Sequence, residues 1–254
     1  MGVVVNTNIS SITASRILSE NRADLEKAME RLASGKRINS AADDAAGMAV
    51  AAKMRADIGS LNQSVRNTND AISLVNTYDG AAAEIESILI RMRELAVQTR
   101  NGTYEEADRT NANFEYTALK NEITRIAGVS AFNRMTVGQG SSGGAGGTGV
   151  ADTTFTFYVG SDVAKTGNSI AFAAKALDLN LAVSSGTLNS VVDTASAGQA
   201  IATLDDAITE LAANRAQAGA LINRLEHTVS NLMNVSQRLQ EAVSGIEDAD
   251  YAAE

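Results

Sequence analysis

Two long stretches of the chain carry apolar residues at intervals of three, four and seven, the spacing of one face of an α-helix. The first contains Ile58, Leu61, Val65, Ile72, Val75, Ala82, Ile85, Leu89, Met92 and Ala96. The second contains Ile201, Leu204, Ile208, Leu211, Ala218, Ile222, Leu225, Val229 and Leu232, and continues through Leu239, Val243 and Ile246. A heptad pattern sustained over so many turns predicts two long helices whose apolar stripes pack together in a core.

Two shorter stretches show the same periodicity. Residues 1–34 carry a partial heptad formed by Leu18, Leu25, Met29 and Leu32. The segment Arg100–Thr103 interrupts the first long series with a basic residue and a glycine suited to a helix C-cap. Beyond it, a shorter helix is predicted from the spacing of Tyr116, Leu119, Ile123 and Ile126.

The middle of the chain has a different pattern. Residues 138–149 form a Gly/Ser-rich linker, and the segment "TFTFYV" places Phe155, Phe157 and Val159 on one face of a strand. We therefore predict a mainly α fold, an elongated helical-bundle rod with a small β-containing central insert. The predicted regions are 1–40, a helix and linker; 41–135 and 200–254, the two parts of the rod; and 136–199, a variable outgrowth with β character.

Composition and charge narrow the possible functions. The net charge of −9 argues against a nucleic-acid partner, because phosphate contacts need clustered Lys and Arg. The absence of proline suits long uninterrupted helices, and the absence of cysteine excludes thiolate metal sites. No run approaches the roughly 20 apolar residues of a membrane span, and "MGVVVNTNIS" lacks the basic region of a secretory signal peptide. Taken literally, these features describe a soluble cytoplasmic protein.

The adjacent carboxylates Asp43 and Asp44 are the first candidates for chemistry. Ser40 followed three residues later by Asp43 matches a helix N-cap with an acidic N3 residue. Adjacent helical residues point about 100° apart, so the pair does not converge on a substrate. We interpret Ser40 and Asp43 as the start of a helix.

Other candidate sites are weak. A G-x-G-x-x-G match at Gly138–Gly143 lacks the helix that a dinucleotide site needs, and the single histidine, His227, has no second histidine to complete a metal site. We therefore expect no enzyme activity, no metal and no cofactor.

Several motifs resemble bacterial flagellin, the subunit of the flagellar filament. They are "VNTN" at 5–8, "RLASGKRINSAADDAAGMAV" at 31–50, "NTNDAISLVNTYDGA" at 67–81, "RMRELAVQ" at 91–98, "NEITRIAGVSAFN" at 121–133 and "NRAQAGALINRLEHTVSNL" at 214–232. The resemblance covers about residues 1–135 and 200–254, the terminal regions that define the family. It implies an antiparallel coiled-coil rod, with residues 1–40 contributing a filament-core helix.

The resemblance also implies partners and a location. Flagellins polymerise with further flagellin subunits into a filament used for motility. They leave the cell through the flagellar type III export apparatus, so an extracellular location needs no signal peptide. Flagellins usually continue past the segment similar to "IEDADYAAE" into another amphipathic helix, which pairs with the first one. The resemblance therefore implies that this polypeptide lacks its extreme C-terminal helix and stays monomeric by itself.

A further implied partner is the Toll-like flagellin receptor of animal hosts. The family's contact residues fall on Arg91, Leu95 and Glu122 of this sequence. Arg91 and Leu95 are four residues apart and share a helix face. The alternative is that Ile88 and Leu95 form a second apolar stripe that packs on the 104–128 helix, which leaves only Arg91 available.

Two other functions remain open from sequence alone. A hook–filament junction protein shares some of the "SGKRIN…DD" pattern, although "RELAVQ" and "NRLEHTVSNL" favour flagellin. A coiled-coil surface adhesin or binding module would use the strand region, and tight ligand binding by residues 136–199 would indicate it.

Overall fold

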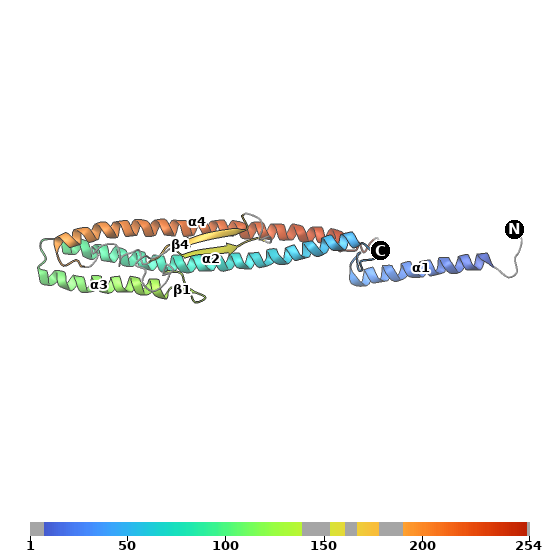
Figure 1. Ribbon diagram of the computed structural model, residues 1–254, viewed down its shortest axis with the longest axis horizontal. Coiled ribbons are helices and arrows are strands. Elements are labelled where there is room, and N and C mark those ends of the chain that lie inside the picture. Colours follow the sequence, from blue (N-terminus) through green and yellow to red (C-terminus); the bar gives the residue numbers. More distant parts are fainter. Residues whose placement is uncertain (1–7, 139–152, 161–166, 178–189, 253–254) are drawn as a thin grey trace. The chain divides into compact units, whose positions relative to one another are not determined.

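The computed structural model describes residues 8–138, 153–160, 167–177 and 190–252, and within these ranges it contains four helices and four short strands (Figure 1). The helices are α1 (Ile9–Ser34), α2 (Ala45–Arg100), α3 (Glu106–Val129) and α4 (Thr194–Glu247). The strands are β1 (Ala131–Phe132), β2 (Met135–Thr136), β3 (Thr153–Tyr158) and β4 (Ser169–Ala174). The mainly α fold class with a small β-containing insert is confirmed.

The chain divides into two compact units. Unit 1 comprises residues 1–62 and 233–254, and unit 2 comprises residues 63–232. The divisions fall inside α2 and α4, so each of these helices contributes to both units. The region boundaries expected from sequence composition therefore differ from the boundaries of these units.

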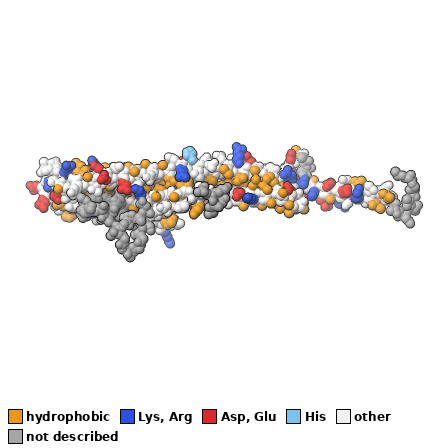
Figure 2. Space-filling view, turned by 45° about the horizontal axis from the view of Figure 1, so that its top comes forward, with side chains coloured by type: hydrophobic (Ala, Val, Ile, Leu, Met, Phe, Trp, Pro, Cys, Tyr) orange, Lys and Arg blue, Asp and Glu red, His pale blue; other side chains and the backbone are white. Residues whose placement is uncertain are grey.

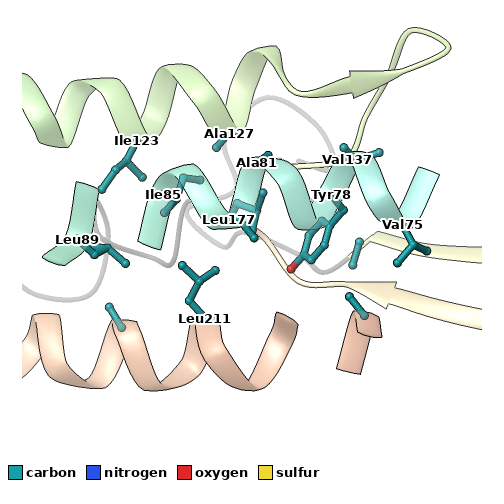
Figure 3. Close-up of a cluster of buried hydrophobic side chains, with 14 of the residues drawn as sticks. Val75, Tyr78, Ala81, Ile85, Leu89, Ile123, Ala127, Val137, Leu177 and Leu211 are labelled. Carbon is teal, nitrogen blue, oxygen red and sulfur yellow. The ribbon is translucent and has the colours of Figure 1, made fainter. Parts of the chain in front are cut away.

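In unit 2, α2 and α4 run antiparallel. Asp79 of α2 pairs with Arg215 of α4 at 2.9 Å, whereas Arg93, further along α2, pairs with Asp205, earlier on α4. Figure 3 shows α2 between α3 and α4, with Ile123 of α3 and Leu211 of α4 pointing towards the α2 side chains. One continuous cluster of buried hydrophobic residues joins these three helices. The apolar periodicity places these side chains on the inward faces.

The β3–β4 hairpin belongs to the same core. The strands pair antiparallel, and alternate residues of β4, Ile170, Phe172 and Ala174, are buried. The ring of Tyr78 on α2 meets the ring of Phe172 edge-on with centroids 5.4 Å apart, and its hydroxyl donates to Lys175 O at 3.1 Å. A strand is confirmed at Phe155 and Phe157, but β3 ends at Tyr158 and Val159 lies just beyond it. The described part of the insert packs on the helices, because its alternating apolar residues need a surface to cover them.

A tight hairpin connects α3 to the insert. Strands β1 and β2 pair around Asn133 and Arg134, which both have positive φ, as a two-residue type I′ hairpin turn requires. Gly138 follows, and a Cβ there would lie 2.7 Å from Ala127 O of α3. Only glycine allows the backbone to approach α3 this closely. The sequence pattern alone did not indicate this hairpin.

Glycine ends the first helix but not the second. Gly35 has φ 70°, and its N–H donates to Arg31 O at 2.8 Å, a left-handed cap on α1. Helix α2 ends at Arg100, where the pattern breaks, but Gly102 does not adopt positive φ. The expected glycine C-cap at Gly102 is therefore wrong. Asn101 N–H instead donates to Gln98 O at 3.2 Å, which tightens the last turn.

Candidate functional site

Helix α1 of unit 1 carries a large apolar surface that nothing in the described structure covers. None of its 26 residues is buried. Leu18, Leu25, Met29 and Leu32 share one face of the helix and remain 39–69% exposed. Figure 2 shows hydrophobic side chains on α1, at the right of the view, among charged ones. Such a face is typical of a helix whose partners lie on other chains.

The opposite face of α1 is polar. Arg16 and Glu20 are paired at 3.9 Å one turn apart, and Lys27 reaches Asp43 at 3.5 Å. Both pairs are solvent-exposed on at least one side and contribute little to stability. Helix α1 is therefore divided into an apolar side and a polar side.

The segment after α1 binds the end of α4 within unit 1. Arg37 donates from its backbone N to Glu247 O and from Nη2 to Ile246 O, both at 2.6 Å. These contacts satisfy carbonyls at the helix C-terminus, where a cation is also favoured. Glu247 is buried and pairs with Arg55 of α2. Ala249 N–H donates to Gly35 O at 3.0 Å and completes the junction.

Asp43 and Asp44 lie in this junction with structural roles, but the helix start differs from the predicted one. Helix α2 begins at Ala45, and Asp44 Oδ1 accepts from Gly47 N at 2.8 Å, the contact of an N-cap. The prediction of Ser40 as the helix N-cap is therefore wrong. Ser40 lies in a separate turn, because its N–H and hydroxyl both donate to Asp43 Oδ2 at 3.0 Å and not to the helix.

The same contacts set the charge state of Asp43. Hydrogen bonds from the Ser40 backbone and side chain lower the pKa of Asp43, with smaller contributions from Asn39 and Lys27. The carboxylate is ionised at neutral pH and holds the turn as an acceptor.

The three residues implied in receptor contact lie in unit 2 with different exposure. The side chain of Arg91 is 50% exposed and that of Glu122 is 41% exposed. Leu95 is only 2% exposed and belongs to the buried cluster of unit 2. The expectation that Leu95 shares an accessible face with Arg91 is therefore wrong, and Ile88 and Leu95 form the second apolar stripe that was the alternative.

Both accessible residues already have partners in the same chain. Arg91 donates to Glu115 of α3 at 2.9 Å and to Glu94 at 3.0 Å, and these hydrogen bonds raise the pKa of Arg91. Arg125 donates to Glu122 at 2.8 Å and lowers the pKa of that carboxyl. A partner that binds either side chain must share or displace these contacts.

The residues predicted to form the rod core are all buried or half-buried. The fully buried ones are Leu61, Val75, Ile85, Leu89, Met92, Leu211, Leu225 and Leu232. The half-buried ones are Ile58, Val65, Ile72, Ile208, Ile222 and Val229.

Sequence reasoning missed other buried residues of α2, including Ala71, Leu74 and Tyr78. The feature of the sequence that could have identified them is a second apolar stripe on α2, which faces the sheet and α3.

The described residues contain no group of three or more His, Cys, Asp or Glu side chains that could hold a metal ion. No helix in these same ranges is long and apolar enough to cross a membrane. His227 is exposed on α4. The G-x-G-x-x-G match lies outside the described residues except for Gly138.

The terminal regions of the chain match two family models. Residues 5–142 match the bacterial flagellin N-terminal helical region, and residues 201–254 match the bacterial flagellin C-terminal helical region. The flagellin of Halalkalibacterium halodurans is 39% identical over 254 residues, which cover 99% of this chain and 88% of the relative. The flagellar filament core protein flaB2 of Brachyspira hyodysenteriae is 38% identical over 252 residues, with 98% and 88% covered.

Solved structures agree with this assignment. The crystal structure of Bacillus cereus flagellin is similar with a TM-score of 0.53 at 34% identity, and the match covers 66% of this chain and 88% of that one. A putative flagellar hook-associated protein from Vibrio parahaemolyticus has a TM-score of 0.68 and covers 81% of this chain and 100% of its own. At 13% identity, that second likeness shows the fold alone.

These findings define the chain as a structural protein of the flagellar filament class and not an enzyme. It belongs to the bacterial flagellin family. Flagellins assemble with one another into the extracellular filament, so the predicted family and function are confirmed. The hook–filament junction alternative is not favoured, because flagellin relatives match over nearly the whole chain.

Proposed function

We propose that the apolar face of α1, formed by Leu18, Leu25, Met29 and Leu32, is a surface through which this flagellin binds other subunits in the filament. The observation that carries the proposal is that α1 has no buried residue although it exposes these four large side chains. Isolated helices of this length are marginal in water, since packing supplies most of a helix's stability. Contact with neighbouring subunits supplies that packing.

The energetics support a subunit contact. Burying apolar surface stabilises by about 25 cal/mol per Å², so four large side chains on one face favour association strongly. Contacts between different surfaces of identical subunits, when they do not close into a ring, build an open helical filament. The apolar face of α1 supplies one of the two surfaces that such a contact needs.

The test compares two charge-introducing variants of α1. Leu25→Asp places a carboxylate on the apolar face, whereas Ala23→Asp places it on the opposite, polar side of the same helix. Both residues are exposed, so neither change disturbs a core within the chain. Each variant is expressed and purified separately as a monomer and mixed with salt and short filament seeds of the unaltered flagellin, and the products are sedimented and viewed by negative-stain electron microscopy. We expect Leu25→Asp to abolish pelletable filaments and Ala23→Asp to keep them; equal assembly by both would refute the proposal.

Export through the flagellar type III pathway is the second part of the proposal. It rests on family membership, since flagellins function outside the cell. Replacing the cell's own flagellin with this gene and probing the medium of a strain that lacks a functional export gate tests it. Appearance of the chain outside such cells would contradict the proposed route.

Recognition by the Toll-like flagellin receptor of animal hosts is a third proposal, now restricted to Arg91 and Glu122. It is supported by the exposed guanidinium of Arg91 and by the family resemblance. Arg93 supplies a matched control, because it is similarly exposed and pairs with Asp205 on α4. We expect Arg91→Ala to weaken receptor binding by about tenfold or more and Arg93→Ala to leave it unchanged, measured by titration calorimetry. Equal effects would place the contact elsewhere.

A further inference from the structure

The loop between α2 and α3 contains the one Asn-Gly pair in the sequence, Asn101–Gly102. Asn101 and Gly102 are exposed. A Cβ added at Gly102 would meet no atom within 4 Å, so the space around its nitrogen is open. An asparagine followed by glycine is the pair in which the next backbone nitrogen meets least steric hindrance when it approaches the side-chain amide carbon.

Besides the bond from Asn101 N–H to Gln98 O, three hydrogen bonds hold this pair in a definite arrangement. Asn101 Oδ1 accepts from Thr103 N at 3.3 Å. The backbone O of Asn101 accepts from Arg109 Nη2 at 3.3 Å and from Tyr104 N at 3.4 Å. Within the described part of the chain, the Gly102 N–H makes no hydrogen bond of its own.

We propose that the folded loop promotes deamidation of Asn101 and that Arg109 assists it. Gly102 N loses its proton to water and attacks Asn101 Cγ, forming a new C–N bond. The Cγ–Nδ2 bond then breaks, and the side-chain nitrogen leaves as ammonia with a proton from solvent. The resulting succinimide reacts with one water molecule at either carbonyl and gives aspartate or isoaspartate. No oxidant, metal or enzyme takes part.

The position of each donor fits this chemistry. The backbone O of Asn101 belongs to the peptide bond whose nitrogen must become the nucleophile. A guanidinium on that oxygen stabilises the negative charge that the amide acquires when its nitrogen is deprotonated. Thr103 N–H donates to Oδ1, the oxygen that carries the charge of the tetrahedral intermediate, as an oxyanion-hole donor does. The loop therefore stabilises charge at both reacting groups.

The chain contains its own comparison site. Asp79–Gly80 has the same glycine neighbour but lies inside α2, where the backbone is helical and Gly80 N faces along the helix axis. Asp79 also pairs with Arg215. Isomerisation at this pair requires the helix to open, so it tests whether exposure and loop geometry matter.

Modification would change the charge at the junction of two helices. A carboxylate at residue 101 lies just beyond the C-terminus of α2, where negative charge is unfavourable, and next to Arg109, whose buried Nε has no acceptor among the described residues. Isoaspartate also lengthens the main chain by one methylene. Each modified subunit thus carries an irreversible covalent change in this loop.

The experiment follows Asn101 in the folded protein at neutral pH over several weeks. Trypsin releases residues 101–109 as one peptide, which mass spectrometry separates into asparagine, aspartate and isoaspartate forms. The same chain unfolded in urea gives the rate without loop geometry. We expect the folded rate to equal or exceed the unfolded rate, and the peptide containing Asp79–Gly80 to remain unchanged in the folded protein.

Two variants complete the test. Gly102→Ala should slow deamidation by about tenfold or more in both states, because a β-methyl crowds the attacking nitrogen. Arg109→Gln, whose tryptic peptide extends to Lys120, should slow it severalfold in the folded state and not in urea, provided that circular dichroism shows the fold intact. An Asn101 that survives in the folded chain but not in urea would overturn the proposal. An unchanged folded rate in Arg109→Gln would overturn the role of Arg109.

Discussion

Unit 2 and unit 1 differ in how much of their apolar surface the chain itself covers. Unit 2 buries large side chains from three helices and a hairpin in one cluster, among them Tyr78, Tyr116, Ile85 and Leu204. In the described part of unit 1, the buried hydrophobic residues are Ile38, Ala51 and Leu61. Unit 2 is stabilised within one subunit, whereas unit 1 leaves apolar faces exposed.

The difference follows from the number of elements that meet each helix. In unit 2, α2 carries two apolar stripes, because α3 and the β3–β4 hairpin cover it in addition to α4. In unit 1, α2 and α4 have a single seam, held by contacts such as Ser236 Oγ to Asn62 Oδ1 at 3.2 Å. One seam buries one stripe per helix, and α1 adds none.

The largest expected effect is a charge placed in the core of unit 2. Leu225 of α4 is fully buried, and Leu225→Asp would place a carboxylate there without a partner. We expect a loss of at least about 4 kcal/mol in the free energy of unfolding. Thermal and urea melts monitored by circular dichroism measure it.

Glu210→Gln is the control for that variant. Glu210 lies on the same helix, and its only described partner is the exposed Lys175 at 3.5 Å. Its loss should cost less than about 0.5 kcal/mol. Similar losses in both variants would mean that the α2–α4 register is different from the one described.

The next largest effect is a difference in stability between a buried and an exposed residue on the same turn of α2. Leu95 is 2% exposed and Val97 is 49% exposed. Leu95→Ala should destabilise unit 2 by about 2–5 kcal/mol, since it removes buried methyl groups and leaves a cavity. Val97→Ala should melt close to the parent. An unchanged melting temperature in Leu95→Ala would indicate that Leu95 is exposed. Leu95 would then again be a candidate for receptor contact.

A smaller effect, of opposite sign, is expected at Tyr116 of α3. Its hydroxyl is buried and has no hydrogen-bond partner among the described residues. Removing an unsatisfied buried polar atom is favourable, so Tyr116→Phe should stabilise unit 2 by about 1 kcal/mol at neutral pH. A less stable variant would indicate that the hydroxyl has a partner in the native protein.

The pH dependence of Tyr116 gives a second measurement on the same variant. Burial raises the pKa of Tyr116 well above its usual range. The unfolded chain releases the proton near pH 10 and the folded chain does not, so stability falls as the pH rises past that point. Tyr116→Phe should lose less stability than the parent between neutral pH and pH 11 in urea melts.

The smallest effect concerns the turn of unit 1. The pKa of Asp43 is lowered by hydrogen bonds from Ser40, so its contribution is present at neutral pH and is lost as the pH falls through the folded-state value. The amide proton of Ser40, which donates to Asp43, should report this titration by NMR with a midpoint below the ordinary value of an aspartate. Asp43→Asn should remove the titration. A midpoint at or above the ordinary value would mean that the turn is not formed.

The sequence was sufficient for the long helices because the periodicity of their seams continues for many turns. The sequence was insufficient to predict which residues are buried where one helix packs against two neighbours. Leu95 and Met92 lie on different stripes of α2, and both are buried because α3 covers a second face. A helix with two buried stripes cannot be distinguished, from its own residues, from one with a single stripe and scattered apolar residues.

The prediction of where α2 begins was wrong for a different reason. Ser40 and Asp43 have the spacing of a capping box, and Asp44 and Gly47 offer the same chemistry a few residues later. Local pattern alone gives no preference between the two. The contacts of Arg37 with the end of α4 fix the backbone before residue 40, and this tertiary constraint places the first helical turn at Ala45.

The hydrogen bond from Arg37 to Ile246 joins residues 209 positions apart, and this separation leads us to expect an order of folding. The α2–α3 pair Arg91–Glu115 spans 24 positions, and the α2–α4 pair Arg93–Asp205 spans 112. The entropy lost on closing a loop grows with its length, so contacts near in sequence form first. Helices α2 and α3 can therefore pair early, and α4 adds to them next. The junction of unit 1 forms last, because it needs residues from both ends of the described chain to be available at the same time.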